Sequence, residues 1–363
     1  MVSPTGTGDG DATDDGAPVG DAVRERGATL TDPSEVAIAL VEYGDGLATA
    51  VESALAGRSG VVAYGVPLGL LPSILEARKR TDDGAPWRIA CRPGAVDALG
   101  RALVLGTDAA EAVADGSIVL RTLPGDEGLR DVASVSGSAT VTGFGSLVFA
   151  TPDRADAVAG PRQEPTLLSE TGDSTATAVF HAATTRFEAA TPATVSMPSR
   201  TGLLAAAREV LDDRFATDLA AVLDGLDYGE LGRSGAVADR TLLVALAARH
   251  DQLFRDLRRW IDGEGAAGGA SERDVDRVAV APSQELTDDR RALVRRELIE
   301  SIKVPMGPGR PKLRLRAVDE ALLRARPTEV LSVLRGRFAL PLDESGTLRR
   351  GADGGGRRPV WDR

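Results

Sequence analysis

The chain has 363 residues, which is enough for two domains with well-buried cores. Its formal net charge of -11 excludes nucleic-acid binding through a general positive field, so any such binding must be local. A lone cysteine, Cys91, excludes an internal disulfide, and no run of about 18 apolar residues predicts a membrane span.

The basic residues are almost all arginine, and the lysines are confined to Lys79, Lys303 and Lys312. Few lysines with many aspartates is typical of the acidic proteins of halophilic archaea that accumulate salt in the cell. Molar salt shortens the Debye length to roughly 3 Å, so an acidic protein can approach DNA with little repulsion. An acidic protein from a bacterium with a GC-rich genome is the alternative source of this composition.

Residues 1–31 are rich in Gly, Asp, Thr and Ala, and their composition predicts a disordered acidic tail. These N-terminal residues lack the apolar segment that is typical of a signal peptide, so we expect a cytoplasmic protein. A helix is predicted from Asp32-Pro33, with Asp32 as N-cap and Pro33 in the first turn, to about Ala56.

Strand and helix patterns then alternate as far as residue 123. The predicted strands are Gly60–Tyr64, Trp87–Cys91 and Ser117–Leu123, and the predicted helices are Leu70–Arg80, Pro93–Leu103 and Ala109–Ala114. Next, Ser134–Thr142 and Leu147–Ala150 read as a hairpin or an antiparallel edge. Residues 151–174 are predicted to be mostly loop, and Thr175–Phe180 a further strand. This order predicts an α/β sandwich over residues 32–199, a sensor or dimerisation domain.

Apolar residues recur at helical spacing between Arg200 and Leu226 and predict one long helix there. We expect residues 200–235 to form a helical connector, or else an element of a dimer interface. The pattern from residue 236 is helical, with predicted helices at Leu242–His250, Leu253–Gly263 and Val318–Arg337. The second domain is assigned to residues 236–340, and residues 341–363 are predicted to be a disordered tail.

The second domain contains an arginine-rich segment, Thr287–Ser301, that predicts a helix entering a DNA groove. Between Leu286 and Arg316 there are nine basic and four acidic residues, a local positive patch in an acidic chain. Arg291 and Arg295 are four residues apart and can reach one groove together. Asp288 and Asp289 suit the positive end of the helix dipole but would repel phosphate.

The residues that follow predict a β-hairpin that forms a basic wing. Gly307, Pro308, Gly309 and Pro311 supply a tight turn, with Arg310 at its tip. Beyond the turn, basic residues alternate with leucines, so period 2 places the basic side chains on one face. The predicted DNA-binding residues of helix and wing are Arg291, Arg295, Arg296, Lys303, Arg310, Lys312, Arg314 and Arg316.

The segments Lys303-Val304-Pro305 and Gly309-Arg310-Pro311-Lys312-Leu313-Arg314-Leu315 resemble haloarchaeal transcriptional regulators of the TbsP type. The resemblance spans most of residues 33–337 and is strongest in the wing. It implies an N-terminal α/β domain, a C-terminal winged helix-turn-helix and a regulator of transcription, acting as repressor or activator. Three features depart from the pattern that this family implies. Thr287-Asp288-Asp289 opens the recognition helix, Glu297 stands where the family has glycine, and a stretch of residues is inserted near Gly263 to Gln284.

The sequence matches motifs of known enzymes poorly. We therefore expect that the protein is not an enzyme and has no cofactor and no metal site. Tyr64–Gly69 follows a strand but lacks the GxGxxG spacing of a dinucleotide site, and no GxSxG motif occurs. His181 is predicted at a strand end and His250 at a helix C-terminus, and Cys91 reads as inert core. The alternative for this domain is a site near Arg92 for an effector that carries phosphate or carboxylate.

These patterns predict a DNA-binding transcriptional regulator, a homodimer on double-stranded promoter DNA with a small-molecule effector in its N-terminal domain. The alternative is a winged-helix module that binds a protein partner or senses a ligand without binding DNA. Salt distinguishes the two, because loss of binding with rising salt indicates phosphate contacts.

Overall fold

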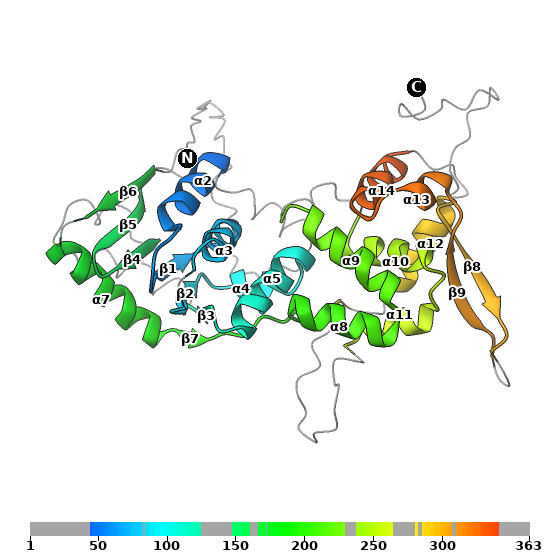
Figure 1. Ribbon diagram of the computed structural model, residues 1–363, viewed down its shortest axis with the longest axis horizontal. Helices are drawn as coiled ribbons and strands as arrows, with labels where there is room; N and C mark the ends of the chain where they lie inside the picture. The colour runs from blue at the N-terminus through cyan, green and yellow to red at the C-terminus, as the bar shows by residue number, and fades with distance from the viewer. Residues whose placement is uncertain are drawn as a thin grey trace, which may run out of the picture.

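The computed structural model describes residues 44–82, 84–124, 147–159, 166–171, 173–228, 237–263, 280–281, 285–306 and 310–340. It has an N-terminal part built on a sheet and a helical C-terminal part that carries a small hairpin (Figure 1). The predicted tails, the predicted strand Ser134–Thr142, residues 32–43 of the first predicted helix and most of the inserted segment near Gly263 to Gln284 lie outside the described residues. Within the described part of the chain, no helix combines the length and apolar character needed to cross a membrane.

The N-terminal sheet has the strand order β6-β5-β4-β1-β2-β3-β7 among the described residues. Strands β1, β2 and β3 are parallel, whereas β4, β5 and β6 form an antiparallel extension next to β1. The bounds are β1 Val62–Val66, β2 Trp87–Cys91, β3 Ile118–Thr122, β4 Val148–Thr151, β5 Arg154–Ala159, β6 Thr166–Glu170 and β7 Thr191–Pro192. The predicted α/β class is therefore confirmed, with a mixed sheet.

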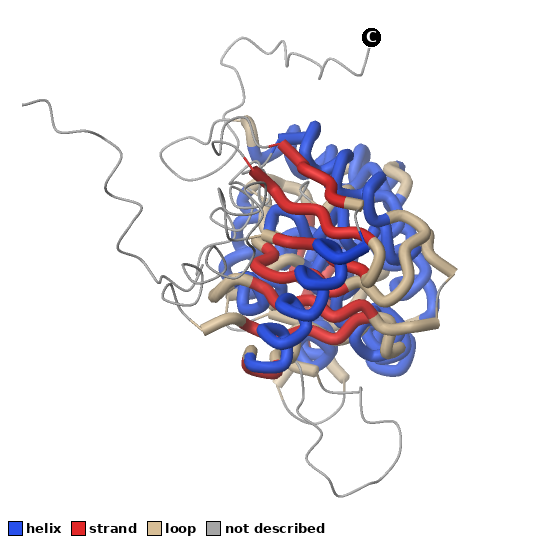
Figure 2. The backbone as a smooth tube through the Cα atoms, turned by 90° about the vertical axis from the view of Figure 1, so that its left-hand side faces the viewer, coloured by secondary structure: helices blue, strands red, loops and turns tan. Residues whose placement is uncertain are grey.

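Helices cover both faces of this sheet, and Figure 2 shows them in front of and behind the strands. Their bounds are α2 Gly44–Leu55, α3 Leu71–Lys79, α4 Ala95–Leu99, α5 Leu103–Ala114 and α7 Asp173–Ala189. Helix α7 packs on β1, β4 and β5 and closes one apolar cluster with Val62, Tyr64 and Val148. The other face of the sheet belongs to the main core.

Two predictions for this domain are wrong. The expected strand Thr175–Phe180 lies inside α7, because Ala176, Val179, Ala183 and Phe187 recur at helical spacing and are all buried. The expected loop over residues 151–174 contains β5 and β6 instead, since the edge of β4 offers unpaired backbone groups to a neighbouring strand. His181 accordingly lies within α7 and not at a strand end.

The C-terminal part is built from helices and one hairpin. The bounds are α8 Arg200–Val210, α9 Asp213–Gly225, α10 Asp239–Arg249, α11 Phe254–Ile261, α12 Leu286–Arg295, β8 Ile299–Val304, β9 Lys312–Ala317, α13 Glu320–Arg324 and α14 Val330–Phe338.

Two single helices predicted here are each divided in two. The segment from Arg200 to Leu226 breaks at Asp212, whose side chain accepts a hydrogen bond from the Phe215 N–H at 2.7 Å and caps α9. The segment Val318–Arg337 breaks before Pro327, which disfavours helix at the preceding residue. Asp319 caps the first of its two helices through the Leu322 N–H.

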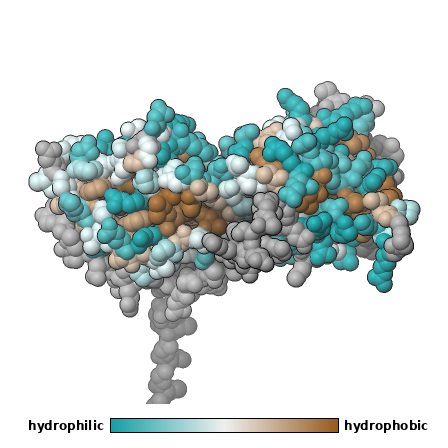
Figure 3. All heavy atoms as spheres, turned by 60° about the horizontal axis from the view of Figure 1, so that its bottom comes forward, coloured by the Kyte–Doolittle hydropathy of each residue, from teal (hydrophilic) through white to brown (hydrophobic). Residues whose placement is uncertain are grey.

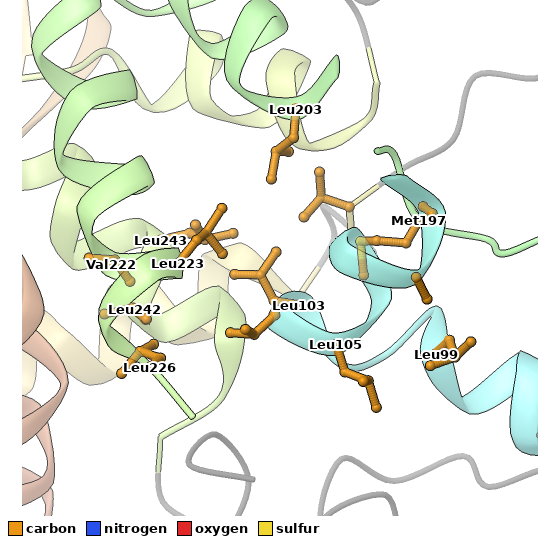
Figure 4. Packing of buried hydrophobic residues seen from close by; sticks show 14 of the residues in the cluster. Leu99, Leu103, Leu105, Met197, Leu203, Val222, Leu223, Leu226, Leu242 and Leu243 are labelled. Carbon is orange, nitrogen blue, oxygen red and sulfur yellow. The ribbon is translucent and has the colours of Figure 1, made fainter. Parts of the chain in front are cut away.

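One hydrophobic core runs through both parts of the chain. Leu103 of α5 points toward Leu223 of α9 in Figure 4, and both belong to one buried cluster with Leu203 of α8 and Leu242 of α10. Deeper in the C-terminal part, Phe215 and Trp260 meet edge to face with ring centroids 5.2 Å apart. The apolar residues predicted for a connector or dimer element therefore pack within the chain.

Helix α5 is capped by residues of the C-terminal part. Ala102, the residue before α5, has no side chain that could cap the helix. Asp239, at the start of α10, takes this part and accepts a hydrogen bond from the Leu103 N–H at 2.8 Å. In return, Glu111 of α5 accepts bonds from the Thr201 N–H at 2.9 Å and the Thr201 hydroxyl at 2.6 Å. These contacts fasten the two parts to each other at both ends of α5.

Asp239→Asn is expected to remove a pH-dependent contribution to stability. Burial raises the pKa of the Asp239 carboxyl to about 6, against the opposing effects of the Leu103 N–H and Arg240. Because the folded state holds this proton more tightly, the contribution is fully present below about pH 4 and is lost as pH rises through the folded pKa. The loss is about 1–2 kcal/mol after allowance for partial exposure.

Urea unfolding between about pH 4 and 8 measures this difference. The stability of the asparagine variant relative to the unmodified protein should rise with pH. The matched control is Asp213→Asn, whose side chain is 91% exposed. A constant difference between the Asp239 variant and the unmodified protein would contradict the prediction.

Candidate nucleic-acid interface

From α10 to β9 the C-terminal part has the element order helix, short extended segment, two helices and hairpin. Between α10 and α11, Leu253 forms a bridge to Arg314, and the Leu315 N–H donates to the Gln252 carbonyl at 2.9 Å. This extended segment lies beside β9, which pairs antiparallel with β8. With α10, α11 and α12 packed against it, the arrangement is a winged helix-turn-helix, as the sequence predicts.

Helix α12 is the second helix of the helix-turn-helix pair. Leu286 and Leu293 are fully buried and set the face that points into the domain. Asp289 accepts a hydrogen bond from the Thr241 hydroxyl at 2.7 Å and lies 3.1 Å from Arg240 Nε, both on α10. Asp289 therefore holds the helix in place and does not oppose phosphate at the surface. Sequence reasoning missed Arg240 and Thr241, because only the fold brings them to α12.

The outer face of α12 carries Arg291 and Arg295, both exposed. Asp288 shares this face and pairs with Arg291 at 3.1 Å, so the first turn is locally neutral. Val294 is 37% exposed between the two arginines. The face thus offers two guanidinium groups and one apolar side chain, which suits hydrogen bonds to base edges and contact with a thymine methyl group.

The other two arginines of this segment, Arg290 and Arg296, are turned toward the protein. Arg290 donates to the Ser301 hydroxyl at 3.0 Å and stacks over the Phe254 ring at 5.4 Å. Arg296, a predicted DNA-binding residue, stacks over Phe338 of α14 at 4.1 Å. Burial, and then a neighbouring arginine, lower the pKa of each group. Arg296 thus lies between α12 and α14, apart from the outer face.

The hairpin register determines the two faces of the wing. Lys312, Arg314 and Arg316 stand opposite Val304, Ile302 and Glu300 in the pairing of β9 with β8. Leu313 and Leu315 point the other way, and Leu315 is fully buried, as the alternation predicts.

The remaining wing residues are placed as follows. Lys303 is paired with Leu313, so it lies on the opposite face from the three basic residues of β9. Arg310 is exposed next to the turn, whose residues 307–309 lie outside the described part of the chain. Arg316 also lies 3.1 Å from Asp251 and 3.7 Å from Glu300, which reduces its effective charge.

The predicted helix Thr287–Ser301 ends at Arg295, and β8 begins at Ile299. The Glu297 N–H donates to the Val294 carbonyl at 3.0 Å and the Leu298 N–H to the Leu293 carbonyl at 3.1 Å, which is a Schellman C-cap. This cap requires a left-handed residue, and Glu297 has φ 55°. Glycine, the residue that the resemblance implies at this position, adopts this conformation without steric cost.

Glu297→Gly is therefore expected to raise the free energy of unfolding by about 1 kcal/mol, since glycine adopts positive φ without steric cost. Glu297→Ala serves as the control, because it removes the carboxylate but keeps the β-carbon that causes the strain. Urea unfolding of both variants compares them. Equal stability of the two variants would show that strain at this residue is negligible.

The other candidate residues of the sequence lie apart from this surface. Cys91 is fully buried in β2, and burial raises its pKa to about 12. Arg92 follows β2 and donates to the Gly65 carbonyl at 3.0 Å. His250 caps the end of α10 and lies 2.9 Å from Asp218. Among the described residues, no group of three or more His, Cys, Asp or Glu side chains could hold a metal ion.

Comparison with known families covers both parts of the chain. Residues 42–198 match the family model described as transcriptional regulator TbsP-like, N-terminal. Residues 199–335 match the model described as transcriptional regulator TbsP-like, C-terminal HTH domain. No match is found among curated proteins or among solved structures. Since the two matched segments adjoin and follow the order of the family, the chain belongs to the TbsP-like transcriptional regulators.

Proposed function

We propose that this protein regulates transcription by binding promoter DNA through α12 and the wing. The observation that carries the proposal is the outer surface of the winged helix. It presents Arg291 and Arg295 on α12, and Arg310, Lys312 and Arg314 on the wing, in a chain of net charge -11. A local excess of arginine on a helix-turn-helix is the feature expected of a DNA-binding surface.

The parts of this surface have different tasks in our proposal. Arg291 and Arg295 enter the major groove and contact base edges. Arg310 reaches the adjacent minor groove, whose negative potential attracts arginine. Lys312, Arg314 and Arg316 contact phosphates from one face of the wing, and Lys303 contacts a phosphate from the other face. Arg296 stacks on Phe338 and stabilises the end of α12.

We further infer a homodimer on the promoter, because two helix-turn-helix units can occupy half-sites one helical turn apart. An apolar band on the N-terminal domain, visible in Figure 3, supports pairing through that domain. The same domain is our candidate for binding a small effector. The composition supports a cytoplasmic protein of a halophilic archaeon, where such regulators work in concentrated salt.

The proposal is tested by the double variant Arg310→Ala with Lys312→Ala in mobility-shift assays at high potassium. We expect about tenfold weaker binding to duplex DNA and a shallower dependence on salt, because each phosphate contact releases counterions. The control is Arg208→Ala with Arg214→Ala, which removes the same charge from exposed positions of α8 and α9. Wing and control variants with equal affinity would exclude the wing from the interface. Salt-insensitive binding to a protein would instead favour the protein-interaction alternative.

A further inference from the structure

A groove of about 410 Å³ lies between α11 and the start of β9. Figure 1 shows the hairpin projecting beside this helix. The groove is lined on the helix side by Arg255, Arg258 and Arg259 and on the wing side by Pro311, Lys312 and Leu313. The sequence pattern by itself predicts no function for the three arginines of α11.

These arginines form a row whose direction is set by packing. They are spaced i, i+3, i+4 and are exposed, whereas Leu257 and Trp260 on the opposite side of α11 are buried. The burial of that side leaves the helix no freedom to turn the arginines away from the groove.

The groove has a positive balance. Four basic side chains line it, counting Lys312, and Asp262 is the acidic residue of its lining. Asp256 lies next to the row, 3.2 Å from Arg255 Nε and 4.0 Å from Arg259. Four cations against two carboxylates leave a local excess of positive charge in a strongly acidic chain, which indicates an anionic partner.

The groove is continuous with the proposed DNA surface. Its lining includes Phe254, and the ring of Phe254 carries the guanidinium of Arg290 from α12. Lys312 belongs both to the groove and to the basic face of the wing. The groove and the basic face of the wing therefore meet at Lys312.

We propose that this groove binds the sugar-phosphate backbone of duplex DNA as a second, sequence-independent contact. The inference rests on the proposed function and extends it to α11. Arginine binds phosphate through two parallel N–H···O bonds, so a row of three can hold successive phosphates of one strand. Such contacts determine the position and orientation of the protein but carry no base information.

The test uses the full chain and a short duplex of random sequence. Arg255→Ala, Arg258→Ala and Arg259→Ala are combined in one variant. The control variant combines Arg208→Ala, Arg214→Ala and Arg324→Ala, which has the same net charge and whose residues are all exposed. Affinity is measured over a range of potassium concentrations, and hydroxyl-radical footprints are recorded for each variant. Circular dichroism melting shows whether both variants fold.

We expect the groove variant to bind about ten- to a hundredfold more weakly and its salt slope to fall by about 2–3, close to one per lost phosphate contact. The base preference of selected sites should stay unchanged, and the footprint should lose protection on one backbone segment. Equal affinity, slope and footprint of groove and control variants would overturn the inference while the proposed function stands. If the unmodified protein shows no salt-dependent DNA binding, the proposed function and this inference are both excluded.

Discussion

Gly106→Ala is expected to lower the free energy of unfolding by about 3 kcal/mol, the upper part of the range for overpacked cores. A β-carbon at residue 106 would lie 2.1 Å from the carbonyl oxygen of Leu99 and 3.3 Å from Met197 Cγ. The first contact is with backbone, which cannot move aside as a flexible side chain can. The substitution therefore forces α5 away from α4 at the place where Leu99, Leu105 and Met197 gather (Figure 4).

The consequence should extend beyond the N-terminal domain. Helix α5 also holds Leu103 against the C-terminal helices and receives its cap from Asp239. If α5 is displaced, part of this packing is lost in both parts of the chain. We therefore expect a single unfolding transition at a lower urea concentration, and not separate unfolding of one domain.

The control is Gly46→Ala in α2, where a β-carbon meets nothing within 4 Å. That change should raise the free energy of unfolding by about 0.5–1 kcal/mol, because alanine has a higher helix propensity than glycine. Equal stability of the two variants would disprove the steric argument.

The second large effect concerns sequence recognition by α12. Arg291→Ala with Arg295→Ala is expected to weaken binding to a selected DNA site by about 2–6 kcal/mol if each guanidinium contacts a base, at 1–3 kcal/mol for each bidentate pair. Binding to random duplex should fall far less, since the wing and the other basic residues keep their phosphate contacts. The ratio of the two affinities is therefore the quantity to measure.

Site selection from a random library provides the comparison. The unmodified protein should yield a defined motif, the α12 variant a weaker or altered one, and the variant at Arg310 and Lys312 nearly the original one. The matched control removes Arg208 and Arg214, which are exposed on helices away from the wing. An identical motif from the α12 variant would show that these two arginines do not read bases.

Several elements followed from local sequence. Trp87–Cys91 matches β2 residue for residue, because a short apolar run bounded by turn residues is recognisable without its neighbours. The alternation of basic residues and leucines in β9 gave the two faces of the wing for the same reason. The break that separates α8 from α9 was missed because Asp212, the cap of α9, lies within a continuous apolar pattern.

Other elements could not be read locally. The segment Arg154–Ala159 is a strand because β4 lies beside it, and its own pattern is interrupted. Asp156 in that strand is buried and paired with Arg58, a partner distant in sequence. The choice between helix and strand for Thr175–Phe180 depended on the apolar surface that β1 and β4 offer to α7.

The sequence by itself determined that this protein has a basic wing in an acidic chain, since charge and period 2 are properties of consecutive residues. Only the tertiary structure decided which basic side chains share a surface. Arg290 and Arg296 stack on Phe254 and Phe338, whereas Arg291 and Arg295 remain on the outer face of α12. It also brought the arginines of α11 to the wing and turned Asp289 inward onto Thr241. These placements depend on contacts between residues far apart in the chain, which local patterns do not encode.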